Sequence, residues 1–297
     1  MKRSKKVMMK LLLCLCLAFG FANVAMIQAK AKTLKEAGDF EYWENGDGKT
    51  VTIVGPLKKG ASQRKSITKV VIPAKIDGKK VTALAGRAFS ECKNLKTVVI
   101  ESGIKSIGND AFDECYKLTS ITIPASVKKI PVPPKSGIGM WLNLCSKNLV
   151  VITTQGSYAE KYFKKYSLYL GGKFVNDSNT GHFEGSIYKK AKVVSVAKVK
   201  NLKAKTDMTS MVLTWKKTKK MSGYQIQYST DAAFANVQTK TVKASKTKYT
   251  LKNLEMGTTY YVRIRAYKTY KTTKGKKVKA YGEWTTLSKA TLSQMAE

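Results

Sequence analysis

A set of apolar positions recurs every 23 residues in the stretch between Val70 and Ile130. A period of this size is typical of stacked repeats, because one short strand and one turn cannot bury their own apolar side. Stacked units share a continuous core. Seven residues and their copies one period later carry the pattern: Phe89 and Phe112, Cys92 and Cys115, Leu95 and Leu118, Val98 and Ile121, Ile100 and Ile123, Ile104 and Val127, Ile107 and Ile130.

Two departures from the repeat predict features at its surface. The unit that begins at Val70 has extra polar residues around 77–80, which predict a turn. After Ile130 the register breaks, and an inserted loop is expected over 131–141. Trp141 lies at the apolar tip of that loop, and we expect it to pack against the last repeat.

The segments on either side of the repeat have the patterns of capping elements. Aromatic and β-branched residues over 40–54 flank an Asn-Gly-Asp-Gly turn, which predicts a β-hairpin that covers the first unit. At the other end, Ser157 precedes apolar residues at helical spacing, and Glu160 lies three residues further on. This is the arrangement of a capping box. It predicts a short amphipathic helix that closes the stack.

From Ala197 the apolar period changes to two, as in Tyr260-Tyr-Val262-Arg-Ile264. Short alternating strands separated by turns predict a β-sandwich, with Trp215, Leu254 and Tyr260 in its core. The expected fold class is mainly β: a short repeat solenoid with a terminal helix, followed by a sandwich.

Both halves resemble known families. Phe89-x-x-Cys92-x-x-Leu95, the Ile123-Pro124 ending and Gly156-Ser-Tyr-Ala-Glu160 are similar to the BspA-type leucine-rich repeat family over about 38–170. That resemblance implies an exported bacterial surface or secreted protein, and some members of the family act in adhesion.

The second half resembles a fibronectin type III domain over 197–292. The residues that carry this resemblance are Leu254-x-x-Gly257-Thr258-x-Tyr260-x-Val262-x-Ile264-x-Ala266, with Trp215 upstream. The resemblance implies that Tyr260 is the corner tyrosine that ties its strand to the preceding turn.

The first 31 residues have the pattern of a secretory signal. A lysine-rich start precedes a mostly apolar run and an Ala-Lys-Ala cleavage site. The run is shorter than the roughly 20 residues that a membrane anchor needs. The expected layout is a signal peptide at 1–31, the repeat domain with its hairpin cap at 32–170, a linker at 171–196, the fibronectin type III domain at 197–292 and a tail at 293–297.

The chain has 55 Lys and Arg against 19 Asp and Glu, a net charge of +36. Removal of residues 1–31 would leave +30, and nearly all of it is lysine. Lysine is a hydrated point charge, whereas arginine forms the planar fork favoured for reading nucleic acid. The composition therefore favours a protein, anionic polysaccharide or wall polymer as partner over nucleic acid. Solubility alone is an equal alternative.

Charge is densest in the second domain, where 22 Lys and Arg face only four acidic residues. Six lysines lie between the last two expected strands, with tyrosines among them, and they are the candidate polyanion-binding residues. A solvated hairpin loop is the alternative for this segment. The six are Lys268, Lys271, Lys274, Lys276, Lys277 and Lys279.

Residues with catalytic or metal-binding chemistry are sparse. The single histidine, His182, falls in the expected linker, and Asp110 and Asp113 fall in a repeat turn rather than a cleft. The cysteines after the signal, Cys92, Cys115 and Cys145, lack the close pairs of a zinc site, so we expect buried free thiols. The sequence predicts no enzyme, no cofactor and no metal.

Arg263 and Arg265 alternate with the inward residues of their strand and must share its outer face. Trp284 begins the neighbouring strand. A guanidinium is attracted to the face of an indole ring, so we expect a structural stack in which the arginines do not contact ligand.

These observations predict a secreted or cell-wall associated interaction or adhesion protein without a stable membrane insertion. Two alternatives stay open. One is an accessory binding module of an exported wall-modifying enzyme system, and the other is a nucleic-acid binder. A surface with so much lysine and no catalytic constellation fits a binding module best.

Overall fold

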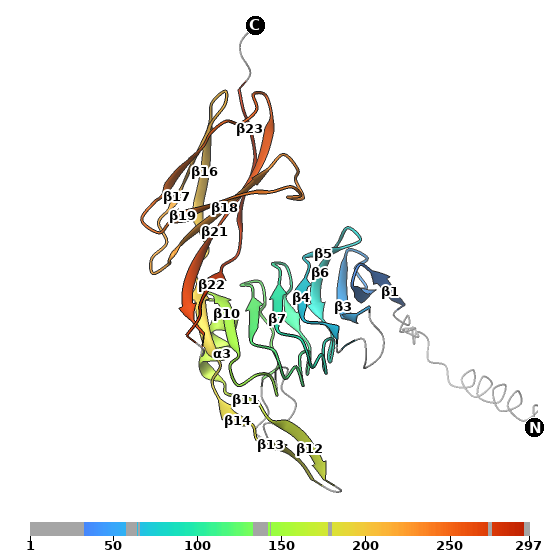
Figure 1. Cartoon of the computed structure of the whole chain (residues 1–297). Helices are drawn as coiled ribbons and strands as arrows, with labels where there is room; N and C mark the ends of the chain where they lie inside the picture. The colour runs from blue at the N-terminus through green and yellow to red at the C-terminus, as the bar shows by residue number, and fades with distance from the viewer. Residues whose placement is uncertain are drawn as a thin grey trace, which may run out of the picture. The chain divides into compact units, whose positions relative to one another are not determined.

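The computed structural model describes residues 33–57, 64, 66–132, 142, 144–177, 180–272 and 275–293, and Figure 1 shows its course. The expected signal peptide, the loop tip at Trp141 and nearly all of the expected tail lie outside these residues. From Leu34 onward, the chain belongs to one unit by its contacts.

The first strands form the predicted cap. Antiparallel pairing joins β1 (Leu34–Ala37), β2 (Phe40–Glu44) and β3 (Thr50–Pro56). The carboxylate of Asp47 holds the hairpin turn by accepting hydrogen bonds from the backbone N–H groups of Lys49 and Thr50 at 2.9 and 2.8 Å. The Thr50 hydroxyl and these N–H groups lower the pKa of Asp47. The hairpin prediction is confirmed.

The repeat region contributes one strand per unit to a parallel sheet. Equivalent residues of successive units lie opposite each other, as Ile72 and Ile100 do. The strands pair in the order β4 (Lys69–Ile72), β7 (Thr97–Ile100), β9 (Ser120–Ile123) and β10 (Val150–Thr154).

A second set of short strands lies beside the cap. β6 (Lys79–Leu84) pairs in parallel with β3 and with β8 (Ser106–Ile107), and antiparallel with β5 (Lys75–Ile76). The turn between β5 and β6 contains Asp77 and Gly78, which have positive φ angles of 48° and 73°. This is the predicted polar turn.

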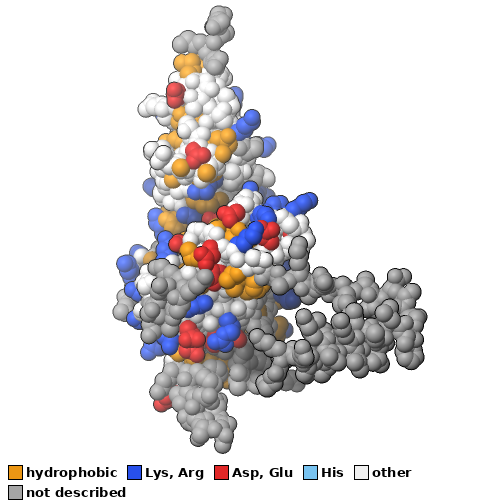
Figure 2. Space-filling model, turned by 90° about the vertical axis from the view of Figure 1, so that its right-hand side faces the viewer, with side chains coloured by type: hydrophobic (Ala, Val, Ile, Leu, Met, Phe, Trp, Pro, Cys, Tyr) orange, Lys and Arg blue, Asp and Glu red, His pale blue; other side chains and the backbone are white. Residues whose placement is uncertain are grey.

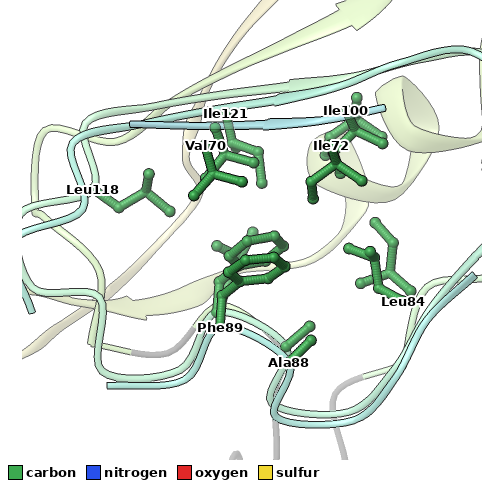
Figure 3. Close-up of a cluster of buried hydrophobic side chains, with 14 of the residues drawn as sticks. Val70, Ile72, Leu84, Ala88, Phe89, Ile100, Leu118 and Ile121 are labelled. Carbon is green, nitrogen blue, oxygen red and sulfur yellow. The ribbon is translucent and has the colours of Figure 1, made fainter. Parts of the chain in front are cut away.

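Alternate strand residues of the repeat region fill its core. Figure 3 shows Val70, Ile72, Ile100 and Ile121 on one side of the coil and Phe89 on the other. The rings of Phe89 and Phe112 stack at 5.4 Å with an interplanar angle of 8°. A 23-residue period therefore places equivalent aromatic rings directly above one another.

The three cysteines lie within this core as free, fully buried thiols, as predicted. Each later thiol donates to a carbonyl of the preceding unit: Cys115 Sγ to Phe89 O at 3.2 Å, and Cys145 Sγ to Phe112 O at 3.4 Å. Burial raises the pKa of Cys115 and Cys145 well above the usual range. They act as small apolar residues with one weak donor each.

The predicted helix is α3 (Tyr158–Lys165). The Ser157 side chain accepts from the Glu160 N–H at 3.1 Å, as expected for its N-cap. The reciprocal bond differs from a standard capping box, because Glu160 accepts from the backbone N–H of Gly156 rather than that of Ser157. Tyr162 and Phe163 are buried, so the helix covers the last coil.

Residues 171–196, expected as a linker, are largely strand. β11 (Leu168–Leu170) pairs antiparallel with β14 (Ile187–Lys189), and β12 (Lys173–Asp177) with β13 (Thr180–Glu184). β15 (Lys192–Val196) adds to the repeat sheet in parallel beside β10. A Cβ atom at Gly172, which has φ of 72°, would lie 2.2 Å from the Glu184 carbonyl oxygen, so this bend requires glycine.

The remaining strands form two antiparallel sheets. One contains β16 (Lys200–Thr206), β17 (Met211–Lys216) and β20 (Lys248–Leu251). In the other, the long strand β21 is bordered by β18 on one side and by β22 and β23 on the other. Its members are β18 (Gly223–Ser229), β19 (Gln238–Lys243), β21 (Thr259–Lys271), β22 (Lys277–Tyr281) and β23 (Thr285–Thr291).

The core between these sheets contains the expected residues. Trp215 packs edge-on against Tyr224 at 5.3 Å, and Leu254 and Tyr260 are buried. The Tyr260 hydroxyl accepts from the backbone N–H of Glu255 at 3.2 Å. That bond ties β21 to the preceding turn, as the resemblance implied.

The repeat sheet and the sandwich meet in one apolar cluster. Val150 and Ile152 of β10 and Val194 and Val196 of β15 pack with the sandwich core. Beside them the Glu283 carboxylate accepts hydrogen bonds from the Ala125 N–H at 2.6 Å and from the Thr154 hydroxyl, and Lys198 Nζ lies 3.8 Å away.

Candidate anion-binding site

The hairpin of β21 and β22 carries the lysines singled out from the sequence. Its register places Lys271 opposite Lys277 and Thr269 opposite Lys279, so these three lysines project from one face and are exposed. Lys268 alternates to the other face and is half-buried. Lys276 is exposed in the turn, and Lys274 lies outside the described residues.

A cleft of about 600 Å³ opens where this hairpin meets the last coil of the repeat region. We call it the lysine cleft. Its walls come from the turn before β10, from β14 and β15, and from β21 and β22. Six lysines line it: Lys147, Lys189, Lys190, Lys192, Lys271 and Lys279. The described residues that line the cleft include no acidic side chain.

Contacts with tyrosine rings fix part of the cleft. Lys192 Nζ donates to the Lys271 carbonyl oxygen at 2.9 Å and lies 5.6 Å from the centre of the Tyr270 ring. Lys279 Nζ lies 4.6 Å from the ring centre of Tyr267. These bonds and ring contacts hold basic side chains from separate parts of the chain next to one another.

The structure brings together only part of the set expected from sequence. Lys271 and Lys279 line the cleft, whereas Lys276 and Lys277 lie on the same hairpin without lining it. The sequence analysis missed Lys147 and the three lysines of 189–192. The lysine density of 189–192 was visible, but its place beside the hairpin depends on how β15 joins the repeat sheet.

Basic side chains are spread widely over the described surface. On the face shown in Figure 2, Lys and Arg lie among neutral and acidic side chains. Net charge alone therefore points to no particular site. The lysine cleft is distinguished by its concave form and by a lining without acids.

The predicted arginine stack is confirmed. The guanidinium carbons of Arg263 and Arg265 lie 4.6 and 4.1 Å from the centre of the Trp284 ring. Phe234 and Tyr281, which the sequence analysis did not include, extend it, each 4.1 Å from one guanidinium. Burial lowers the pKa of Arg265 to about 10.

Glutamine side chains of β18 complete the stack. Arg263 Nε donates to Gln227 Oε1, and Arg265 Nε donates to Gln225 Oε1, each at 2.9 Å. Both guanidinium groups are thus held flat between rings and fixed at one edge. This arrangement serves packing on the outer face of the sandwich.

The acidic residues of the repeat turn include one perturbed group. Burial raises the pKa of Asp113 to about 7, and the nearby charges of Asp110 and Glu114 add to the shift. Asp110 and Glu114 have positive φ angles of 55° and 54°, as do Arg87 and Glu91 one period earlier. The turn is therefore a repeated structural feature. Across the described part of the chain, no group of three possible ligands could hold a metal ion.

The fold and the site define a class of protein. A stack of short parallel strands is joined to an antiparallel sandwich, and the most distinctive surface is a lysine-lined cleft. Such a chain is a set of binding modules. No helix in the described ranges is long and apolar enough to span a bilayer.

Family models identify both modules. Residues 57–132 match the BspA type leucine rich repeat region in six copies, and residues 197–280 match the fibronectin type III domain. The chain thus carries a BspA-type leucine-rich repeat region followed by a fibronectin type III domain, as the sequence predicted. Both kinds of module are binding rather than catalytic domains.

Solved structures give further similarities. A computationally redesigned β-sandwich protein is 22% identical, with a TM-score of 0.29, covering 34% of this chain and 95% of its own. The FN1–FN3 domains of chicken CNTN1 are 19% identical, with a TM-score of 0.28, covering 39% and 36%. The fn3 domain of human collagen alpha-1(XX) is 15% identical, with a TM-score of 0.28, covering 34% and 90%. A comparison with curated proteins gave no match.

Proposed function

We propose that this chain is a secreted or cell-wall associated, non-enzymatic interaction protein that adheres to anionic polymers of a wall or glycan layer. In this proposal its repeat region is a short solenoid closed by the hairpin cap and by α3. The signal-like pattern of residues 1–31 supports export. The two binding modules support adhesion.

The observation that carries the choice of ligand is the charge of the fibronectin type III domain. Its 22 basic residues against four acidic ones create a positive field that attracts anionic polymers. Exposed Lys271, Lys277 and Lys279 share one face of the β21–β22 hairpin. Several ammonium groups on one face can contact successive charges of one polymer chain. Such contacts weaken steeply with salt.

The test is retention of the protein of residues 32–297 on an immobilised anionic glycan, with elution by a salt gradient. The triple variant Lys271→Gln, Lys277→Gln and Lys279→Gln should elute at clearly lower salt than the matched control Lys203→Gln, Lys205→Gln and Lys217→Gln. Both variants lose three charges from exposed positions of the same domain. Equal elution of the two would mean that the hairpin is not the binding face.

A pull-down of the same protein against wall fractions and host matrix proteins tests the setting. We expect salt-sensitive capture of anionic wall or glycan material. Capture of one protein that survives high salt, without glycan, would replace the polymer by a protein ligand.

A further inference from the structure

We propose that the lysine cleft is the binding site for a segment of an acidic polysaccharide, whose carboxylates are contacted by lysines of both modules and whose sugar rings lie on an apolar floor. This inference rests on the proposed function, because it presupposes an anionic polymer as ligand. It adds the chemical class of the polymer and the place where it binds.

The rim of the cleft is basic on every side. Lys147 comes from the last coil, Lys189 and Lys190 from the end of β14, and Lys271 and Lys279 from the hairpin. All five are exposed, so their ammonium groups remain hydrated and able to meet a ligand. Ammonium groups that converge from three segments, with no carboxylate between them, favour a ligand with several negative charges.

The floor of the cleft is apolar, and this separates it from a simple charged surface. Leu149, Val150 and Ile152 are buried residues of the last coil that reach the lining, and Tyr270 and Val278 add to it from the hairpin. The C–H face of a sugar ring gains free energy when it leaves water for such a surface. A volume of about 600 Å³ lies within the usual range for ligand sites.

Other polyanions fit the same lining less well. Inorganic polyphosphate carries charge and hydrogen-bond acceptors all around and has no face that benefits from an apolar floor. Single-stranded nucleic acid stacks its bases on successive aromatic rings and commonly uses arginine. The cleft offers one lining ring, Tyr270, and its described lining has no arginine.

The site needs both modules at once. Lys192 connects them, because it belongs to β15 of the repeat sheet while its Nζ bonds to the Lys271 carbonyl oxygen and lies over Tyr270. Lysines on the repeat side should therefore contribute to binding as much as those on the sandwich side. Sequence reasoning, which assigned anion binding to the second domain alone, would not predict this.

The experiment measures the Kd of the protein of residues 32–297 for oligogalacturonate at fixed salt, with inorganic polyphosphate of equal charge as comparison. The cleft variant is Lys147→Gln with Lys190→Gln, and the control is Lys203→Gln with Lys205→Gln. We expect the cleft variant to bind oligogalacturonate about tenfold more weakly and the control to change about twofold or less.

Tyr270 supplies a second, charge-neutral test. Tyr270→Ala should weaken oligogalacturonate binding about tenfold while leaving polyphosphate binding nearly unchanged, because only the sugar uses the floor. Tyr270→Phe keeps the ring, so it should bind almost as the native chain does. Matching thermal unfolding of Tyr270→Phe and the native chain keeps the ring test separate from loss of folding.

The possible failures are distinguishable. If the lysine pair in the cleft behaves like the control pair while the protein still binds oligogalacturonate, the proposed site is wrong but adhesion to anionic polymers stands. If polyphosphate binds as tightly and Tyr270→Ala weakens both ligands equally, the assignment to acidic polysaccharide is wrong. If the native chain binds neither polymer, the proposed function fails together with the site.

Discussion

Glu283 is the acidic side chain on which the contact between the two modules depends. Its carboxylate accepts from the Ala125 N–H and the Thr154 hydroxyl, and the side chain is only 12% exposed. Glu101 makes an equivalent contact in the repeat region, where it accepts from the Ala74 N–H of the neighbouring unit at 3.0 Å. Ala74 and Ala125 both follow the proline after a sheet strand.

We expect Glu283→Ala to destabilise the chain substantially. The substitution leaves a buried N–H and a buried hydroxyl without their acceptor, and each hydrogen bond to a charged group contributes about 1.5–3 kcal/mol. The Lys198 pair at 3.8 Å is half exposed and adds at most about 1 kcal/mol. A loss of about 3 kcal/mol is expected, which lowers Tm by roughly 5–10 °C in a chain of this size.

The assay is thermal and urea unfolding of Glu283→Ala beside Glu255→Ala, an exposed glutamate of the same domain that should change stability by no more than about 0.5 kcal/mol. A double-mutant cycle with Thr154→Val should give a coupling free energy of about 1 kcal/mol or more. Equal unfolding midpoints for the two glutamate variants, or a coupling near zero, would refute the reasoning.

Three further predictions concern single side chains. Arg263→Lys should lower the free energy of unfolding by about 1–2 kcal/mol, because lysine cannot lie flat between Phe234 and Trp284 or bond to Gln227 in the same way; glycan retention should stay nearly unchanged, and a collapse of retention without loss of stability would make the arginine a ligand contact. Cys92, Cys115 and Cys145 should react with a thiol reagent slowly in the native protein and promptly after denaturation, since burial raises the pKa of all three thiols; fast native labelling would contradict their place in the core. Asp113 has a pKa of about 7 in the folded chain against 3.8 as its ordinary value, so its contribution to stability is greatest below about pH 4 and is lost as the pH rises to about 7. Asp113→Asn should therefore raise Tm above pH 7 and change it little at pH 4, and a Tm difference independent of pH would exclude this explanation.

Most of the fold could be predicted because its signals are local or repeated. The 23-residue copy of Phe89 at Phe112 shows where ring stacks upon ring, and the alternation around Tyr260 shows which face of β21 is buried. The arginine stack follows from the same alternation. These patterns depend only on neighbours within one strand or on the next repeat.

The segment 171–196 could not be predicted in the same way. Its glycines and polar residues are typical of a linker, yet Gly172 forms a tight bend between paired strands. Lys192–Val196 alternates for only five residues, and its partner β10 lies about 40 residues earlier in the chain. Nothing local specifies such a pairing. Half of the lysine cleft depends on it, so Lys147 and Lys192 were missed while Lys271 and Lys279 were found.

The apolar cluster between repeat sheet and sandwich limits how this chain can be divided. A boundary placed at residue 197 follows the family models, but it would leave Val150, Ile152, Val194 and Val196 facing water, each of which is now less than 7% exposed. An apolar strand at the edge of a sheet invites pairing with other chains. A repeat fragment without the sandwich should therefore self-associate, and the fibronectin type III domain serves the repeat region as a solubilising cover.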